Sequence, residues 1–143
     1  MTCKMAVWLD HRHAFVVTAC DREITTHTVE FEETPMSRPG GGVRTSARGG
    51  QHGVDPDQRR DAHHALHLGR YYDRIIELLD RADRIHILGP GQAKLELKQR
   101  ILAHKPLASV PLTLEAVDRR TDAQIVAHVR HIFGVPLARA ARG

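Results

Sequence analysis

The sequence predicts one α/β domain built on a mixed five-stranded sheet with three helices. Three short segments rich in apolar and β-branched residues follow one another near the N-terminus, separated by short polar turns. After a long glycine-rich segment, amphipathic helices alternate with two further strands. The first pattern is typical of an antiparallel meander and the second of strands joined through helices, so we expect a mixed sheet.

The N-terminal segments are expected to form the three strands of the meander. They read MAVWL at residues 5–9, AFVVTAC at residues 14–20 and ITTHTVEF at residues 24–31. The DHRH and DREI junctions are short enough for tight connections between antiparallel strands. Polar and apolar residues alternate in the third segment, so one face of that strand is expected to contact water.

A long helix is expected from Asp57 to Arg81, because apolar residues recur there at helical spacing. This stripe is predicted to face the core and comprises Ala62, Ala65, Leu66, Tyr72, Ile75, Ile76 and Leu79. Beside it, Tyr71 is expected to be half-buried with its hydroxyl in water.

Two strands and two helices complete the predicted domain. The strands are RIHIL at residues 84–88 and PLTLEAV at residues 111–117. Between them lies the helix QAKLELKQRILAHK, whose apolar side is expected to hold or adjoin Leu95, Leu97, Ile101 and Leu102. The last helix lies within residues 118–134. It is expected to be capped by Thr121 or Asp122 and to end at Gly134, before Pro136.

The predicted domain covers residues 1–134, with a mobile loop at residues 32–56 and a basic C-terminal tail at residues 135–143. The loop is rich in glycine, proline and arginine, and little in it could pack. A loop of this length within a compact domain is usually functional or disordered. We find no internal repeat and no second domain.

Composition and charge favour a polyanionic partner. The formal net charge is +4, and residues 36–54 contain Arg38, Arg44 and Arg48 with no acidic residue. No apolar run approaches the length of a membrane span, so no membrane partner is expected. Cys3 and Cys20 are too few for a disulfide framework or a cysteine-rich zinc site, and a reducing, cytoplasmic location is the simplest interpretation.

Several stretches carry a resemblance to a known family. The segment VWLDHRHAFV precedes the loop, and the loop contains RGGQ before the long helix. The segments ILGPGQAKLELKQRI and VDRRTDAQIVAHVRHIFG then follow in order. This arrangement resembles the middle domain of eukaryotic and archaeal class I peptide chain release factors, which is ribonuclease-H-like in architecture. It also resembles small single-domain bacterial relatives described as translational machinery proteins. The resemblance covers roughly residues 4–134.

The resemblance implies a role on the ribosome, with rRNA and peptidyl-tRNA as partners and no cofactor. Gly49, Gly50 and Gln51 would be the catalytic residues for hydrolysis of the peptidyl-tRNA ester. The glycines permit close backbone approach, and Gln51 would offer its backbone N–H to the developing oxyanion. The residues expected to contact RNA phosphates are Arg38, Arg44, Arg48, Arg59 and Arg60.

An alternative remains open, namely a non-catalytic ribosome- or RNA-binding module of the hibernation type. Asp55 and Asp57 are acidic where the release factors are basic, which favours this alternative. The chain also lacks the flanking domains of a full release factor, so it would act without stop-codon decoding. Self-association or a partner protein would then supply additional contacts.

Two other kinds of site are disfavoured by the sequence. The histidine pairs have no nearby cysteine and no HExxH-like glutamate, so no metal site is expected. Asp10 ends the first strand, where ribonuclease-H-like nucleases place a metal-binding carboxylate. Its only obvious partners, Asp118 and Asp122, are expected to be turn or cap residues.

Overall fold

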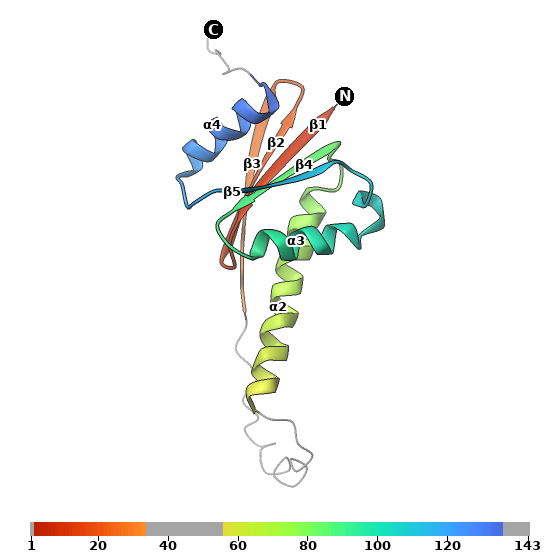
Figure 1. Cartoon of the computed structure of the whole chain (residues 1–143), viewed down its shortest axis with the longest axis vertical. Helices are drawn as coiled ribbons and strands as arrows, with labels where there is room; N and C mark the ends of the chain where they lie inside the picture. Colours follow the sequence, from red (N-terminus) through yellow and green to blue (C-terminus); the bar gives the residue numbers. More distant parts are fainter. Residues whose placement is uncertain (1, 34–55, 136–143) are drawn as a thin grey trace.

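The computed structural model describes residues 2–33 and 56–135. Its centre is a five-stranded sheet with the strand order β3-β2-β1-β4-β5. Helices α2 and α3 cover one face of this sheet and α4 covers the other (Figure 1). The predicted α/β class, the mixed sheet and the three helices are therefore confirmed.

The antiparallel half of the sheet is the meander β1 (Cys3–Leu9), β2 (His13–Cys20) and β3 (Glu23–Glu30). Strand β3 lies at the edge of the sheet, and most of its residues are exposed. Cys3 and Cys20 are direct partners across β1 and β2, with Cα atoms 4.1 Å apart, and they form a disulfide bond. The cysteine count did not predict this bond, because the pairing follows from strand register.

The parallel half consists of β4 (Arg84–Gly89) and β5 (Leu112–Ala116), which are connected through α3 (Ala93–Leu102) and a 3₁₀ turn, η2 (Lys105–Leu107). Helix α3 ends before the predicted limit, since Pro106 has no N–H to continue the α-helical pattern. At the end of β4, a Cβ added to Gly89 would lie 2.3 Å from the carbonyl oxygen of Leu9. Strand β4 and its parallel neighbour β1 can therefore approach this closely only with glycine at position 89.

Two clusters of buried side chains hold the layers together. The first lies between the sheet and α2 (Pro56–Leu78) with α3, and includes Val7, Ile87, Ile75 and Leu97. The second cluster lies between the sheet and α4 (Asp122–Phe133), and it is built around Trp8, Phe15, Leu88, Val129 and Phe133. Strands β1 and β2 thus bury side chains on both faces of the sheet.

Helix α4 begins and ends as the sequence predicts. Thr121 is the N-cap: its side chain accepts a hydrogen bond from the Gln124 N–H, while the Gln124 side chain accepts one from the Thr121 N–H. This reciprocal pair is a capping box. Gly134 follows the last turn with φ of 69°, a left-handed conformation that glycine adopts without steric cost.

Several predictions of burial are wrong. Ala62, Ala65 and Leu66 are exposed, because the first half of α2 extends beyond the sheet (Figure 1). Leu95 and Leu102 are also exposed, on the outer side of α3. Tyr71 is fully buried rather than half-buried, and its hydroxyl donates a hydrogen bond to the carbonyl oxygen of Asp10 at 2.9 Å instead of contacting water.

The predicted loop at residues 32–56 and the tail at residues 135–143 fall largely outside the described residues, and both stay predictions. None of the described helices combines the length and the apolar character that crossing a bilayer requires.

Candidate functional site

Most of the predicted site residues lie outside the described part of the chain, namely Gly49, Gly50, Gln51, Arg38, Arg44 and Arg48. Their roles stay predictions. Arg59 and Arg60 lie at the start of α2, and both are exposed. Arg60 Nη1 lies 3.5 Å from Asp57 Oδ1, whereas Arg59 forms no hydrogen bond or ion pair with any residue in the described ranges. Arg59 is therefore available to a phosphate.

The segment 31–33, which follows β3, is held against α2. Glu33 Oε1 lies 3.0 Å from His64 Nδ1, and the Phe31 ring meets the rings of His64 and Tyr71 edge-on. Further along α2, Arg74 donates a hydrogen bond to the carbonyl oxygen of Glu30 at 2.7 Å. The chain on either side of residues 34–55 is thereby joined by polar and aromatic contacts.

The Glu33 carboxylate lies beside histidines of α2. The hydrogen bond from His64 lowers the pKa of Glu33, and His63 and His67 lower it further through their charge. His63 Nε2 lies 3.9 Å from Glu33, and the rings of His63 and His67 are 4.5 Å apart. His63, His64 and His67 of α2 therefore lie together near the Glu33 carboxylate.

The turn between β1 and β2 is fixed from three directions. The Asp10 carboxylate accepts hydrogen bonds from the backbone N–H groups of Arg12 and His13 at 2.8 and 2.9 Å. Burial acts to raise the pKa of Asp10, but these two hydrogen bonds and nearby positive charge outweigh it and lower the pKa. Tyr71 binds the Asp10 carbonyl, and Phe31 donates its N–H to the Arg12 carbonyl. Asp10 therefore has a structural role in this turn.

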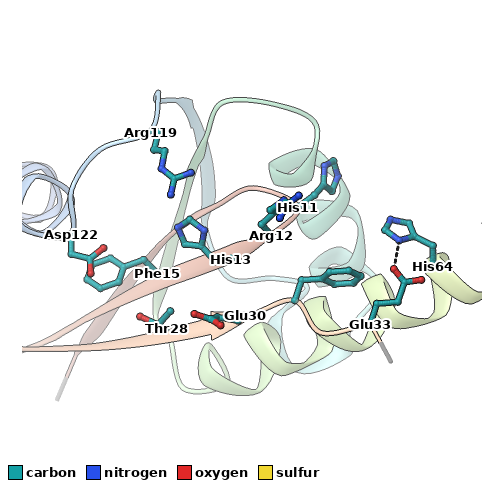
Figure 2. Close-up of a pocket in the computed structure, with 11 residues that line it drawn as sticks. His11, Arg12, His13, Phe15, Thr28, Glu30, Glu33, His64, Arg119 and Asp122 are labelled. Atoms are coloured by element: carbon teal, nitrogen blue, oxygen red, sulfur yellow. Dashed lines mark hydrogen bonds and ion pairs between the residues drawn. The ribbon is translucent and has the colours of Figure 1, made fainter. Parts of the chain in front are cut away.

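A cavity of about 780 Å³ opens beside this turn (Figure 2). Its walls come from the β1–β2 turn, the end of β3, the segment 31–33, α2 and the start of α4. In Figure 2, Arg119 points toward His13, and Thr28 and Glu30 lie across from them. Glu33, the last described residue before position 56, also lines the cavity. The cavity thus adjoins the point at which the chain leaves the sheet.

A second polar cluster lies beneath α4. Glu115 Oε1 is 2.8 Å from His86 Nε2 and 3.0 Å from His128 Nε2. Burial acts to raise the pKa of Glu115, but the hydrogen bonds with His128 and His86 outweigh it and lower the pKa. Within the described residues, no group of three or more histidine, cysteine, aspartate or glutamate side chains is arranged to hold a metal ion.

The cavity could not be predicted from the sequence. Its walls include two residues from turns, Arg12 and Arg119, which lie far apart in the sequence and line one cavity because β1 is central and α4 packs across it. The DHRH turn and the DRRTD cap were both visible as turns. Nothing in their local pattern indicates that both line one cavity.

No protein-family model matches the chain, and no curated protein matches it either. Among solved structures, the Pelota protein of Thermoplasma acidophilum aligns with a TM-score of 0.50 and 20% identity, over 91% of this chain and 32% of that chain. The archaeal translation termination factor aRF1 has a TM-score of 0.46 and 12% identity, over 98% of this chain and 42% of its own. An Aquifex aeolicus Ppx/GppA phosphatase has a TM-score of 0.32 and 12% identity, over 82% and 36%.

The likeness to Pelota concerns the fold alone, since only 20% of residues are identical. This chain spans about a third of the length of the Pelota protein. The alignment covers 91% of this chain, whose described residues form the five-stranded sheet and three helices. The chain therefore has a Pelota-like fold.

Proposed function

We propose that this chain is a translation-associated factor that binds the ribosome and releases the peptide from peptidyl-tRNA without decoding a stop codon. The observation that carries the proposal is the Pelota-like fold together with RGGQ in the segment between β3 and α2. The sequence resemblance to release-factor middle domains supports the same activity. A cytoplasmic location belongs to the proposal, because the substrate is held by ribosomes.

The proposed chemistry requires little from the protein beyond positioning. A water oxygen attacks the ester carbonyl carbon, the bond to the ribose oxygen breaks, and the proton passes to that oxygen. The ribosome supplies most of the surroundings, and a backbone N–H at Gln51 would stabilise the oxyanion. Gly49 and Gly50 would allow the backbone to approach the ester because they have no Cβ.

The described residues support binding to RNA at the start of α2, which follows the RGGQ segment in the sequence. Arg59 is exposed and without an ion pair among them, and Arg60 interacts with Asp57 only across 3.5 Å at the surface. Exposed arginines contribute to RNA affinity mainly through phosphate contacts, and this contribution weakens as salt rises. Arg38, Arg44 and Arg48 would extend the same basic surface toward rRNA and tRNA.

A second candidate is a non-catalytic module that occupies the same ribosomal site. It is favoured by one observation, namely that acidic Asp55 and Asp57 follow Gln51 closely. A single domain with a net charge of +4 would bind a ribosome weakly by itself. Self-association or a partner protein would supply the missing contacts in either case.

The test is release of labelled peptide from purified ribosomes that carry peptidyl-tRNA and have an empty A site. Wild type is compared with Gln51→Ala and Gly50→Ala, and Arg81→Ala serves as a control outside the loop. Catalysis predicts that the two loop variants lose release but still sediment with ribosomes. Sedimentation without release by the wild type would reject catalysis and favour the non-catalytic module.

A further inference from the structure

The cavity beside the β1–β2 turn contains charged groups that the proposed peptide release does not use. Two arginines, Arg12 and Arg119, line it. Within the described ranges, neither forms a hydrogen bond or an ion pair, although the Arg119 charge helps to lower the pKa of Asp10. Arginine is the side chain best suited to hold a phosphate through two parallel hydrogen bonds.

Hydrogen bonds within the β1–β2 turn fix the backbone that carries Arg12. The carboxylate of Asp10 accepts the backbone N–H groups of Arg12 and His13, and the buried Tyr71 hydroxyl binds the Asp10 carbonyl. On the other side, the capping box at Thr121 fixes the start of α4, just after Arg119. Both arginines thus extend from ordered backbone, which lowers the entropic cost of binding a ligand.

The cavity also contains acceptors, which a site for a bare anion would not need. Glu30 and Asp122 line it, and within the described residues their carboxylates have no hydrogen-bond or ion-pair partner. Thr28 adds a hydroxyl. These carboxylates would repel an isolated phosphate but would accept hydrogen bonds from hydroxyl or amino groups of a larger ligand.

Aromatic side chains form another part of the cavity wall. Phe15 and Phe31 line it together with the imidazole of His13. Phe15 is almost fully buried, whereas Phe31 is only partly buried at the cavity wall. A planar base of any identity stacks favourably on a partly exposed ring such as that of Phe31. The volume of about 780 Å³ lies within the range of small-molecule sites.

We propose that this cavity binds a nucleoside phosphate, with its phosphate on Arg12 and Arg119 and its ribose hydroxyl or base amino groups on Glu30 and Asp122. The ligand is either a free nucleotide or one unit of an RNA strand, since both present the same chemistry. The proposal does not depend on peptide release, because none of these residues belongs to the segment 34–55.

The test is equilibrium dialysis of the full chain against labelled adenosine 5′-monophosphate, without ribosomes. Unlabelled adenosine, inorganic phosphate and an RNA hexanucleotide serve as competitors. We expect adenosine and phosphate each to compete at least roughly tenfold more weakly than the nucleotide, because each lacks one set of contacts. Stronger competition by the hexanucleotide identifies RNA as the ligand source, and equal competition per molecule identifies the free nucleotide.

Three variants test the assignment of the walls. Arg12→Gln and Arg119→Gln should each weaken nucleotide binding about tenfold, whereas Arg81→Gln, an exposed arginine outside the cavity, should not. Glu30→Ala should weaken binding of the nucleotide but strengthen that of phosphate, because repulsion is removed. All four variants change exposed side chains, and circular dichroism checks their folding.

Three results would overturn the proposal. The first is the absence of nucleotide binding at millimolar concentration. The second is competition by inorganic phosphate as strong as that by the nucleotide, which would indicate only a general attraction for anions. The third is retention of binding when Arg12 and Arg119 are both replaced. Loss of peptide release in a separate assay would leave all three results unaffected.

Discussion

The two halves of α2 belong to the same helix but have different supports. From His67 onward, the helix buries Tyr71, Tyr72, Ile75 and Ile76 against the sheet and α3. From residue 56 to residue 66, no side chain is buried, and Figure 1 shows this half extending away from the sheet. The first half is thus an extension of a helix that is stabilised elsewhere, because adding turns to an existing helix costs far less than starting one.

The second half of α2 stabilises the fold, and the first half presents exposed side chains. The buried half supplies stability through apolar contact, whereas the exposed half keeps its side chains for contacts outside the core. Its described links to the rest of the chain are polar or aromatic, such as Glu33 with His64. The following substitutions test this division, from the largest expected effect to the smallest.

Ile75→Ala in the buried half should destabilise the protein by roughly 2–5 kcal/mol, because it leaves a cavity beside the sheet. Leu66→Ala in the exposed half is the matched control. Leu66 is 52% exposed, so the change in unfolding free energy should stay within about 0.5 kcal/mol. Urea denaturation measures the unfolding free energy of both variants. Similar losses would show that the two halves contribute equally to stability and would contradict the division.

Removing the Cys3–Cys20 disulfide should cost up to about 3 kcal/mol, since it closes a loop with a sequence separation of 17 residues. Cys3→Ser with Cys20→Ser, compared with the oxidised wild type, gives the loss in thermal unfolding. The reduced wild type is the control and should match the double variant. An unchanged transition temperature in both would mean that the paired strands β1 and β2 need no covalent link.

Tyr71→Phe should destabilise the chain by about 1 kcal/mol, because the Asp10 carbonyl loses its buried donor. Burial raises the pKa of Tyr71, so its hydroxyl stays protonated and available as a donor at neutral pH. The ring remains, and therefore the core packing is preserved. Tyr72→Phe, which removes the hydroxyl that binds Glu96, is a control on the same helix. Amide exchange at Arg12 and His13 should quicken only in the Tyr71 variant.

The contribution of Glu33 to the stability of the fold is expected to be the smallest of these effects, and it should depend on pH. Its pKa in the folded chain is lowered below the ordinary value of 4.5 by the hydrogen bond from His64. The contribution of Glu33 to stability is therefore complete above pH 4.5 and is lost as pH falls through the lowered pKa. Carboxyl NMR should report this pKa directly, and His64→Ala should bring it back toward 4.5. An unchanged value in that variant would contradict the contact.

The sequence predicted the strands and helices well but predicted their surroundings less well. Apolar spacing placed Leu66 in the same stripe as Ile75, yet periodicity cannot show where the sheet beneath a helix ends. Tyr71 was misjudged for a related reason, because its acceptor, the Asp10 carbonyl, is distant in the chain. Capping residues were predicted correctly, since Thr121 and Gly134 act through neighbouring backbone.

The candidate site divides in the same way. The RGGQ segment is visible in the sequence, whereas the cavity depends on strand order and on the position of α4. Cys3 and Cys20 show the same dependence, because their bond follows from the register of β1 against β2. Features made by neighbouring residues were predictable, and features made by distant segments required the structure.

The contacts of residues 31–33 with α2 have a consequence for how this fold can vary between proteins. Glu33 and Phe31 join the chain before residue 34 to His64 of α2. The free energy of closing such a loop changes by only about 0.6 kcal/mol for each doubling of its length. Insertions, deletions or wholly new sequences at this position would leave the sheet and helices almost equally stable. The domain can therefore serve as a platform on which loops of different length and chemistry are exchanged.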